Sequence, residues 1–263
     1  MNAKSPPTLL AQARIQARVI WALTMREVIT RFGREGLGAL WMIAEPSLFI
    51  VGVMIIFSHI DQRTTYSVAE WFAVSYPTLL FWRNATGRVT NAIEINRSLL
   101  HHQPIRPIDI FYSRILLEFS GSAAAFGILY VIFMELGICH APADALQMAL
   151  GYLLIIWFSF AFVLIMASLA ELSETIERVS HIALYLMLPF SGVFFPTFMV
   201  PEPYRTALIA FPLVDSVEYF HHGYYGSAIK TYYNLPYTLF STLLLTLFAL
   251  SLAQISIRRV QLK

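Results

Sequence analysis

Charged side chains are scarce in this sequence, because Asp, Glu, Lys and Arg together make up 13% of its 263 residues. An ordinary soluble domain carries roughly 25%. Hydrophobic residues make up 57%, and they form long runs with the polar residues gathered between them. That pattern excludes the short alternating segments of a transmembrane β-barrel. The composition therefore predicts a helical protein that crosses a membrane several times.

Cysteine and lysine are also few, and the motifs of enzymes are incomplete. Cys139 is the single cysteine, so no disulfide can form within the chain. The nearest approach to a phosphate-binding loop, residues 223–231, has Ile229 where the second glycine would stand. HExxH and GxSxG do not occur, and the four aspartates are isolated. We therefore expect no metal, no cofactor and no nucleotide hydrolysis on this chain. An intramembrane acyltransferase-like enzyme and a passive channel or scaffold are the alternatives from other classes.

Six segments have the length of a transmembrane helix, about 20 residues for a hydrocarbon core of about 30 Å. Their approximate bounds are 37–57, 69–92, 115–138, 146–170, 181–200 and 236–257. The predicted fold is all-α, a polytopic integral membrane protein with one transmembrane domain over residues 1–263. Its parts are a cytoplasmic tail and interfacial helix (1–36), a six-span bundle (37–257) and a second tail (258–263). Between 201 and 234 the apolar pieces are too short to cross, which predicts short helices at the membrane face.

An amphipathic pattern precedes the first predicted span. Trp21, Met25, Val28, Ile29 and Phe32 fall at the spacing of one helix face, and polar residues fall opposite. A helix in a soluble core has the same pattern. Because this one runs directly into a membrane span, it favours a helix that lies in the membrane interface.

Basic residues are unevenly divided between the two sides that six spans would create. Fifteen of the 18 lysines and arginines fall on the side of the two termini, and three, Arg63, Arg205 and Lys230, fall on the other. Loops rich in Lys and Arg stay in the cytoplasm. Both termini are therefore predicted to be cytoplasmic.

The second predicted span contains polar side chains in its cytoplasmic half, and these are Arg83, Asn84, Arg88 and Asn91. An arginine facing lipid in the middle of a bilayer costs about 2.5–3.5 kcal/mol on insertion scales, so such residues face the bundle or a wet cavity. One interpretation is a polar wall that binds an anionic substrate. The other is a structural ion pair, for instance with Glu45 or Glu118, combined with snorkelling toward the interface.

Three segments of the chain together resemble one family. Residues 25–46 read MREVITRFGREGLGALWMIAEP, residues 81–107 read FWRNATGRVTNAIEINRSLLHHQPIRP, and residues 191–196 read SGVFFP. The first resembles the start of the first span in type-2 ABC exporter permeases. The second and third look like the second span with its following loop, and the outer end of the fifth span, in the capsular polysaccharide (KpsM-type) branch of that family.

The resemblance implies a function and a set of partners. It implies a homodimeric permease in the inner membrane of a Gram-negative bacterium, bound to two ATPase subunits that hold ATP and Mg²⁺. The cargo would be a lipid-linked acidic polysaccharide, and no nucleic acid is involved. Periplasmic co-polymerase and outer-membrane export proteins would be further partners. A sister permease for O-antigen, teichoic acid or another lipid-linked glycan is the alternative.

The resemblance also implies roles for particular positions. The family's coupling helix, which docks on the ATPase, falls on residues 96–107, and its residues are Asn96, Arg97, Leu99, Leu100, His101, His102 and Pro104. The gate helix and the start of the first span carry Trp21, Met25, Phe32, Trp41 and Glu45. Short periplasmic helices would correspond to residues 201–223.

Overall fold

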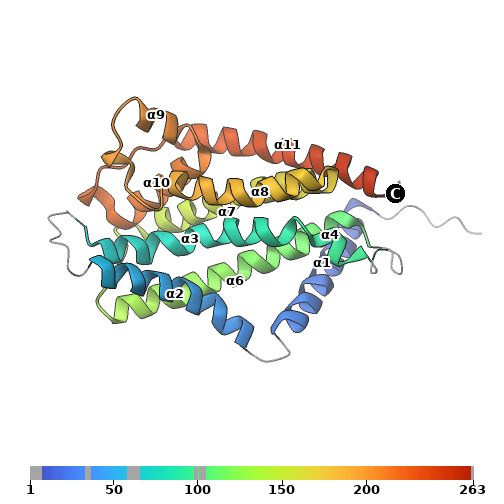
Figure 1. Ribbon diagram of the computed structural model, residues 1–263, viewed down its shortest axis with the longest axis horizontal. Coiled ribbons are helices and arrows are strands. Elements are labelled where there is room, and N and C mark those ends of the chain that lie inside the picture. Colours follow the sequence, from blue (N-terminus) through green and yellow to red (C-terminus); the bar gives the residue numbers. More distant parts are fainter. Residues whose placement is uncertain (1–7, 33–36, 58–65, 98–99, 101–104, 262–263) are drawn as a thin grey trace, which may run out of the picture.

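The computed structural model describes residues 8–32, 37–57, 66–97, 100 and 105–261. In this part of the chain every regular element is a helix, and the helices pack into an elongated bundle (Figure 1). One end of the bundle carries α1 (Leu9–Phe32), α4 (Ala92–Ile95) and the carboxyl end of α11 (Leu235–Gln261). The other end carries α9 (Tyr204–Ile209) and α10 (Pro212–Tyr225).

The helices between these two ends form the body of the bundle. They are α2 (Leu37–Phe57), α3 (Val68–Val89), α6 (Pro107–Glu135), α7 (Ala145–Leu172) and α8 (Glu174–Met187). Within the described residues, α6, α7 and α11 are each long and apolar enough to cross a membrane, and α2 contributes a shorter apolar stretch, Ile43–Phe57. The prediction of an all-helical, polytopic membrane protein agrees with this architecture.

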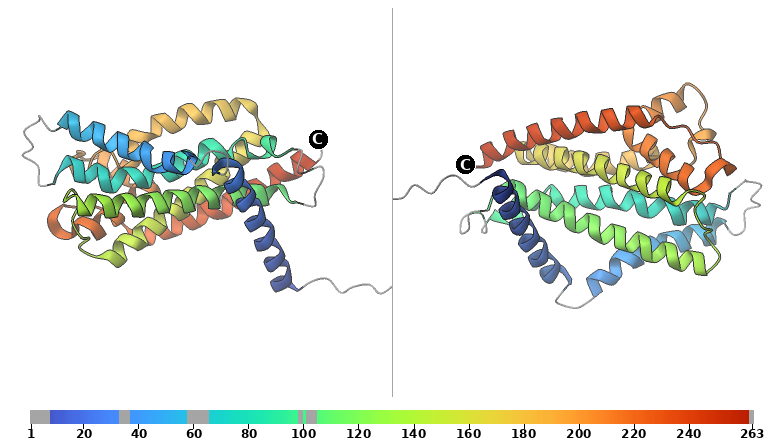
Figure 2. Two further views of the ribbon diagram at one scale, coloured as in Figure 1. Left: turned by 90° about the horizontal axis from the view of Figure 1, so that it is seen from below. Right: turned by 180° about the vertical axis from the view of Figure 1, so that it is seen from behind.

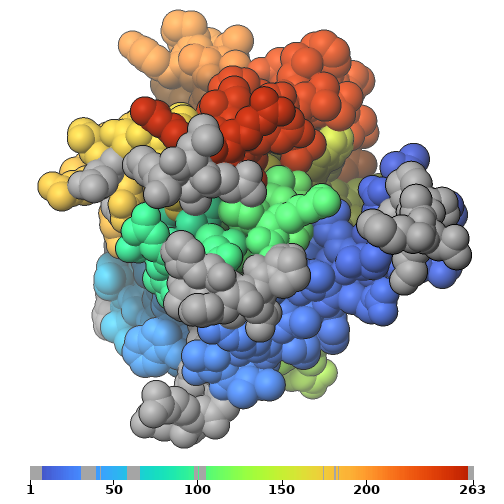
Figure 3. Space-filling model, turned by 90° about the vertical axis from the view of Figure 1, so that its right-hand side faces the viewer, coloured from blue at the N-terminus to red at the C-terminus, as the bar shows by residue number. Residues whose placement is uncertain are grey.

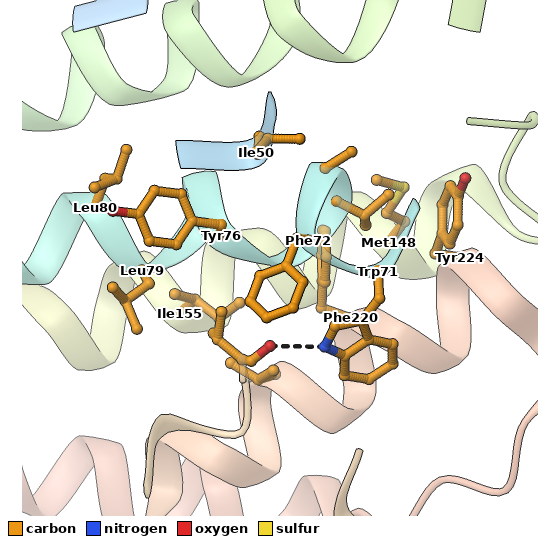
Figure 4. Packing of buried hydrophobic residues seen from close by; sticks show 14 of the residues in the cluster. Ile50, Trp71, Phe72, Tyr76, Leu79, Leu80, Met148, Ile155, Phe220 and Tyr224 are labelled. Carbon is orange, nitrogen blue, oxygen red and sulfur yellow. Dashed lines mark hydrogen bonds between the residues drawn. The ribbon is translucent and has the colours of Figure 1, made fainter. Parts of the chain in front are cut away.

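Helix α3 lies at the centre of the bundle. Every residue from Trp71 to Trp82 is buried, and the Nε1 of Trp71 donates a hydrogen bond to the carbonyl oxygen of Val193 at 2.7 Å (Figure 4). Tyr76 stacks on Phe49 of α2 with ring centroids 3.9 Å apart. Because neighbouring helices surround this stretch of α3, its polar residues Ser75 and Thr78 are shielded by protein.

Helices α7 and α10 cross at close range, and glycine makes this possible. A Cβ atom added to Gly223 would lie 2.3 Å from the backbone nitrogen of Met148, and one added to Gly151 would lie 2.5 Å from the Cα of Phe220. The Asp215 carboxylate on α10 accepts a hydrogen bond from the backbone N–H of Asn234 at 2.9 Å. These contacts fix α10 against α7 and against the start of α11.

The predicted fifth span, residues 181–200, is wrong in its bounds. Helix α8 begins at Glu174 and ends at Met187, and a 3-10 turn, Leu188–Ser191, follows it. Gly192 then adopts a left-handed conformation with φ of 77°, which ends the helical path. The 14 residues of α8 rise about 21 Å, less than the core of about 30 Å. The number of six spans therefore stays a prediction.

Two other predicted spans differ from the structure at the end of the bundle that carries α4. Helix α3 stops at Val89 because Thr90 and Asn91 form a turn, whereas the sequence predicted a span to residue 92. Helix α6 begins at Pro107, eight residues before the predicted start at residue 115. Proline suits the first turn of a helix because its missing N–H would have no partner there.

Helix α1 leans away from the bundle axis and contacts α6 through polar residues (Figure 2). Thr24 is buried, and its hydroxyl lies 3.3 Å from the carbonyl oxygen of Ser113. Gln16 donates to Asp109 at 2.9 Å. Trp21 and Ile29 point outward and are 59% and 69% exposed. An outward apolar face fits a helix in the membrane interface, and that placement stays a prediction.

Candidate functional site

A cavity of about 240 Å³ lies between α2, α3 and α6. Its lining residues are Trp41, Glu45, Pro46, Pro77, Leu80, Asn84, Arg88, Glu118, Ser122 and Ala125. Pro46 of α2 and Pro77 of α3 both stand inside their helices. Proline cannot donate a backbone hydrogen bond and its ring clashes with the preceding turn. Two such positions on neighbouring helices therefore lie at the cavity.

Arg83 is held beside this cavity by three side chains. Its guanidinium forms an ion pair with Glu45 of α2. Nε and Nη2 donate to Oδ1 of Asn84 at 3.2 and 3.1 Å, and Nη1 donates to the hydroxyl of Tyr76 at 3.4 Å. The side chain is 21% exposed. Arg83 therefore joins α2 to α3 and has its donors largely occupied.

Arg88 is one of the residues that line the cavity, and it is the more accessible arginine. Its Nη1 lies 3.2 Å from Oε1 of Glu118 on α6. The side chain of Arg88 is 41% exposed, whereas that of Glu118 is 4% exposed. An ion pair of this kind has one buried partner and one that a ligand in the cavity can reach.

The structure brings three of the four predicted substrate-binding residues together. Arg83, Asn84 and Arg88 surround or line the cavity, whereas Asn91 lies in the turn after α3 and lines a different groove. The predicted polar wall does not extend to Asn91, because α3 ends at Val89. The ion pairs that the sequence left as an alternative, with Glu45 and Glu118, are both present. Contact between these arginines and a substrate stays a prediction.

Arg114 of α6 joins three helices, a role that the sequence reading missed. Its Nη2 lies 3.3 Å from Oε1 of Glu27 on α1, and its Nη1 donates to the carbonyl oxygen of Arg88 at 3.0 Å. That carbonyl belongs to the last turn of α3, where helix carbonyls need external donors and a cation is favoured by the helix dipole. The residue is 8% exposed. A basic residue directly before the predicted start of an apolar segment at residue 115 was the signal that could have identified it.

A second, larger groove of about 1270 Å³ opens at the end of the bundle that carries α1 and α4, and we call it the α4 groove. Figure 3 faces this end of the bundle, and residues of α4, α8 and α11 are among those that line the groove. Of the predicted coupling residues, Arg97 and Leu100 line the groove. Asn96 is buried and accepts a hydrogen bond from Arg26 of α1 at 3.2 Å. Four predicted coupling residues lie outside the described part of the chain: Leu99, His101, His102 and Pro104.

The predicted gate and interface residues separate into two groups. Trp41 and Glu45 of α2 line the cavity, and Trp41 is 62% exposed. Trp21 is exposed and Met25 is half-buried on α1, away from the cavity lining. The side chain of Phe32 lies outside the described part of the structure.

One contact resembles a catalytic pair. The hydroxyl of Ser75 lies 2.6 Å from Nε2 of His221, and both residues are fully buried. Nδ1 of His221 has no hydrogen-bond partner in the described structure, so the carboxylate that orients the base of a catalytic triad is missing. Within the described residues no three His, Cys, Asp or Glu side chains group as metal ligands would. This pair therefore gives the acyltransferase alternative little support.

Comparison with known proteins finds one transporter family and several export proteins similar to this chain. Residues 18–225 match the ABC-2 type transporter family. The capsule polysaccharide export inner-membrane protein CtrC of Neisseria meningitidis serogroup B is 35% identical over 254 residues, 96% of each chain. BexB of Haemophilus influenzae, with the same description, is 34% identical over 90% of each chain. The polysialic acid transport protein KpsM of Escherichia coli is 30% identical over 86% of this chain and 90% of its own.

Proposed function

Because this chain belongs to the ABC-2 type transporter family, we propose that it is the permease subunit of an ATP-driven exporter of lipid-linked capsular polysaccharide in a bacterial inner membrane. The relatives named for capsule polysaccharide export cover nearly its whole length, which favours capsule over O-antigen or teichoic acid as cargo. The same matches favour a transport subunit over an enzyme or a passive scaffold.

The proposal includes an orientation with both termini in the cytoplasm. The end of the bundle with α1, α4 and the carboxyl end of α11 (Figure 1) carries basic residues on four separate segments, among them Arg14, Arg97, Arg178 and Arg258. Arg205 and Lys230 lie at the opposite end, beside α9 and α10. Positively charged loops remain cytoplasmic, so the α1 and α4 end is placed inside the cell.

The proposed partners follow from this orientation and from the family. Two copies of the chain form the conduit, and two ATPase subunits with ATP and Mg²⁺ bind its cytoplasmic end. The α4 groove and the neighbouring α1 offer the docking surface, since Asn96 and Arg26 tie the predicted coupling segment to α1. Periplasmic co-polymerase and outer-membrane export proteins would continue the route.

The cavity between α2, α3 and α6 is the proposed place where the anionic end of the cargo meets the permease. Arg83 and Arg88 stand 15 and 20 residues after the start of α3 at Val68, about 23 and 30 Å along the helix. In a core of about 30 Å, they occupy the cytoplasmic half and its edge. A lipid phosphate or a sugar carboxylate in the inner leaflet lies near this depth, and the arginine fork binds either group bidentately.

The observation that carries the proposal is a pair of arginines at one cavity, where Arg88 lines the cavity and Arg83 lies beside it, in a chain similar to capsule polysaccharide export proteins. Deleting the gene tests the function. We expect surface polysaccharide to disappear, lipid-linked polysaccharide to accumulate inside the cell, and a plasmid copy of the gene to restore export. Normal surface polysaccharide in the deletion strain would refute the proposal.

A further inference from the structure

Each arginine at the cavity already has a carboxylate of its own. Arg83 pairs with Glu45, and Arg88 pairs with Glu118 at 3.2 Å. The carboxylates come from α2 and α6, the two helices that face α3 across the cavity. Glu45, Glu118 and Arg88 line the cavity, and Arg83 lies beside it. These four side chains together carry no net charge, which is unexpected for a site that only has to attract an anion.

The membrane itself poses a selectivity problem for such a site. Anionic phospholipids of the proposed inner membrane surround the protein, and each carries a headgroup with a net negative charge that an unpaired arginine would bind. A binding site for a rare lipid-linked glycan would then be filled by abundant lipid. Specificity against an abundant competitor is commonly achieved by an element that repels it.

We infer that Glu45 and Glu118 are selectivity residues that keep anionic phospholipid headgroups out of this cavity. A headgroup with one negative charge gains little by displacing a carboxylate of equal charge, and it would leave that carboxylate poorly compensated in a buried site. A ligand with several anionic groups can engage both arginines together. The inference rests on the proposed function in one part, which is that the ligand admitted to the cavity is an acidic glycan with a lipid phosphate. The exclusion of phospholipid does not depend on that function.

The two ion pairs differ in exposure, and this difference predicts which glutamate matters more for excluding phospholipid. Glu118 is 4% exposed and faces an arginine that is 41% exposed, so Arg88 is the donor that a headgroup reaches first. Glu45 is 30% exposed, and its partner Arg83 is additionally held by Asn84 and Tyr76. Removing the charge of Glu118 is therefore expected to open the site to phospholipid more than removing that of Glu45.

The test measures bound lipid on the full-length protein, without any export assay. Wild type, Glu118→Gln and Glu45→Gln are purified in mild detergent with phosphatidylglycerol or phosphatidylethanolamine added, and native mass spectrometry counts the retained lipids. Glutamine keeps the size and the hydrogen-bonding oxygen. We expect Glu118→Gln to retain at least threefold more phosphatidylglycerol than wild type, with a smaller gain for Glu45→Gln and little change for phosphatidylethanolamine.

Two further variants make the result specific. Arg88→Gln combined with Glu118→Gln is expected to return to the wild-type lipid count, because the receiving guanidinium is gone. Glu94→Gln is the matched control, since Glu94 is exposed and pairs with Arg97 in the α4 groove, outside the cavity. It is expected to bind lipid as wild type does.

Three results would overturn the inference: a wild-type phosphatidylglycerol count in Glu118→Gln, an equal gain for both lipids, or the same gain after loss of Arg88. If Glu118→Gln cannot be purified, the count for Glu45→Gln decides by the same criteria. A deletion strain that still exports polysaccharide would instead refute the proposed function and leave the lipid result standing. The two failures are therefore distinguishable.

Discussion

Replacing Gly223 by alanine tests the packing of α10 against α7, on which the end of the bundle that carries α9 and α10 depends. The new Cβ would lie 2.3 Å from the nitrogen and 2.7 Å from the Cα of Met148. Both are backbone atoms of α7, so no side-chain rotation can relieve the clash. Ordinary contacts of this kind lie at 3.4–4 Å, and the two helices would have to separate by about 1 Å or more to reach them.

The loss of stability caused by Gly223→Ala can be estimated as a free energy and as a change in Tm. Overpacking a tight interior costs about 1–3 kcal/mol, and one kcal/mol shifts the unfolding midpoint of a chain of this size by about 2–4 °C. We therefore expect Gly223→Ala to lower the apparent Tm of the purified protein by about 2–12 °C, with export reduced in parallel. Gly151→Ala is expected to act in the same direction, since its Cβ would lie 2.5 Å from the Cα of Phe220.

The chain provides matched controls for this experiment. Gly52 of α2 and Gly127 of α6 have no atom within 4 Å of an added Cβ. Alanine there removes the helix penalty of glycine, about 1 kcal/mol, so Tm should stay level or rise slightly. Thermal unfolding in one detergent decides the matter. Equal Tm values for Gly223→Ala and Gly127→Ala would refute the close α7 and α10 crossing.

Three other predictions concern the orientation of the chain, the reactivity of Cys139 and the coupling to the ATPase. Cysteine introduced at position 230 is expected to react with an impermeant thiol reagent in intact spheroplasts, and one at position 261 is not; the reverse pattern would invert the topology. The native Cys139 gives little background labelling at neutral pH, because burial raises the pKa of its thiol to about 11 and only the thiolate reacts. Labelling of Cys139 should therefore increase as the pH rises toward 11. Leu100 packs against the core and lines the α4 groove. The double variant Leu99→Asp with Leu100→Asp is therefore expected to lose both co-purification of the ATPase and polysaccharide export. Normal co-purification together with normal export would exclude a docking role.

The helices with continuous apolar faces could be predicted closely from the sequence. The first span was predicted as 37–57, which are the bounds of α2, and the bounds of α7 differ by at most two residues from the prediction. The fifth span could not be placed this way, because the apolar run continues past Met187 while Gly192 turns the chain. Hydropathy reports which residues avoid water, and it does not report where a helix ends.

The candidate site was predictable in its residues but not in its geometry. Arg83 and Arg88 are conspicuous in an apolar segment, and their possible partners could be named, because few carboxylates occur at the same depth. The choice between partners, and the cavity beside Pro46 and Pro77, depend on how three helices meet in space. Arg114 was counted only as a basic residue, since its contacts with α1 and with the end of α3 are tertiary.

One double variant, Arg83→Ala with Arg88→Ala, tests whether these two arginines bind an anionic cargo in the membrane. Surface polysaccharide and recovery of the ATPase-bound complex are measured in the same cells. We expect export to be lost while the complex is recovered at near wild-type yield. Arg88→Lys keeps the charge but not the planar fork, so it is expected to retain partial export. Normal export in the double variant, or failure of the complex to assemble, would show that the arginines serve only the structure and do not bind cargo.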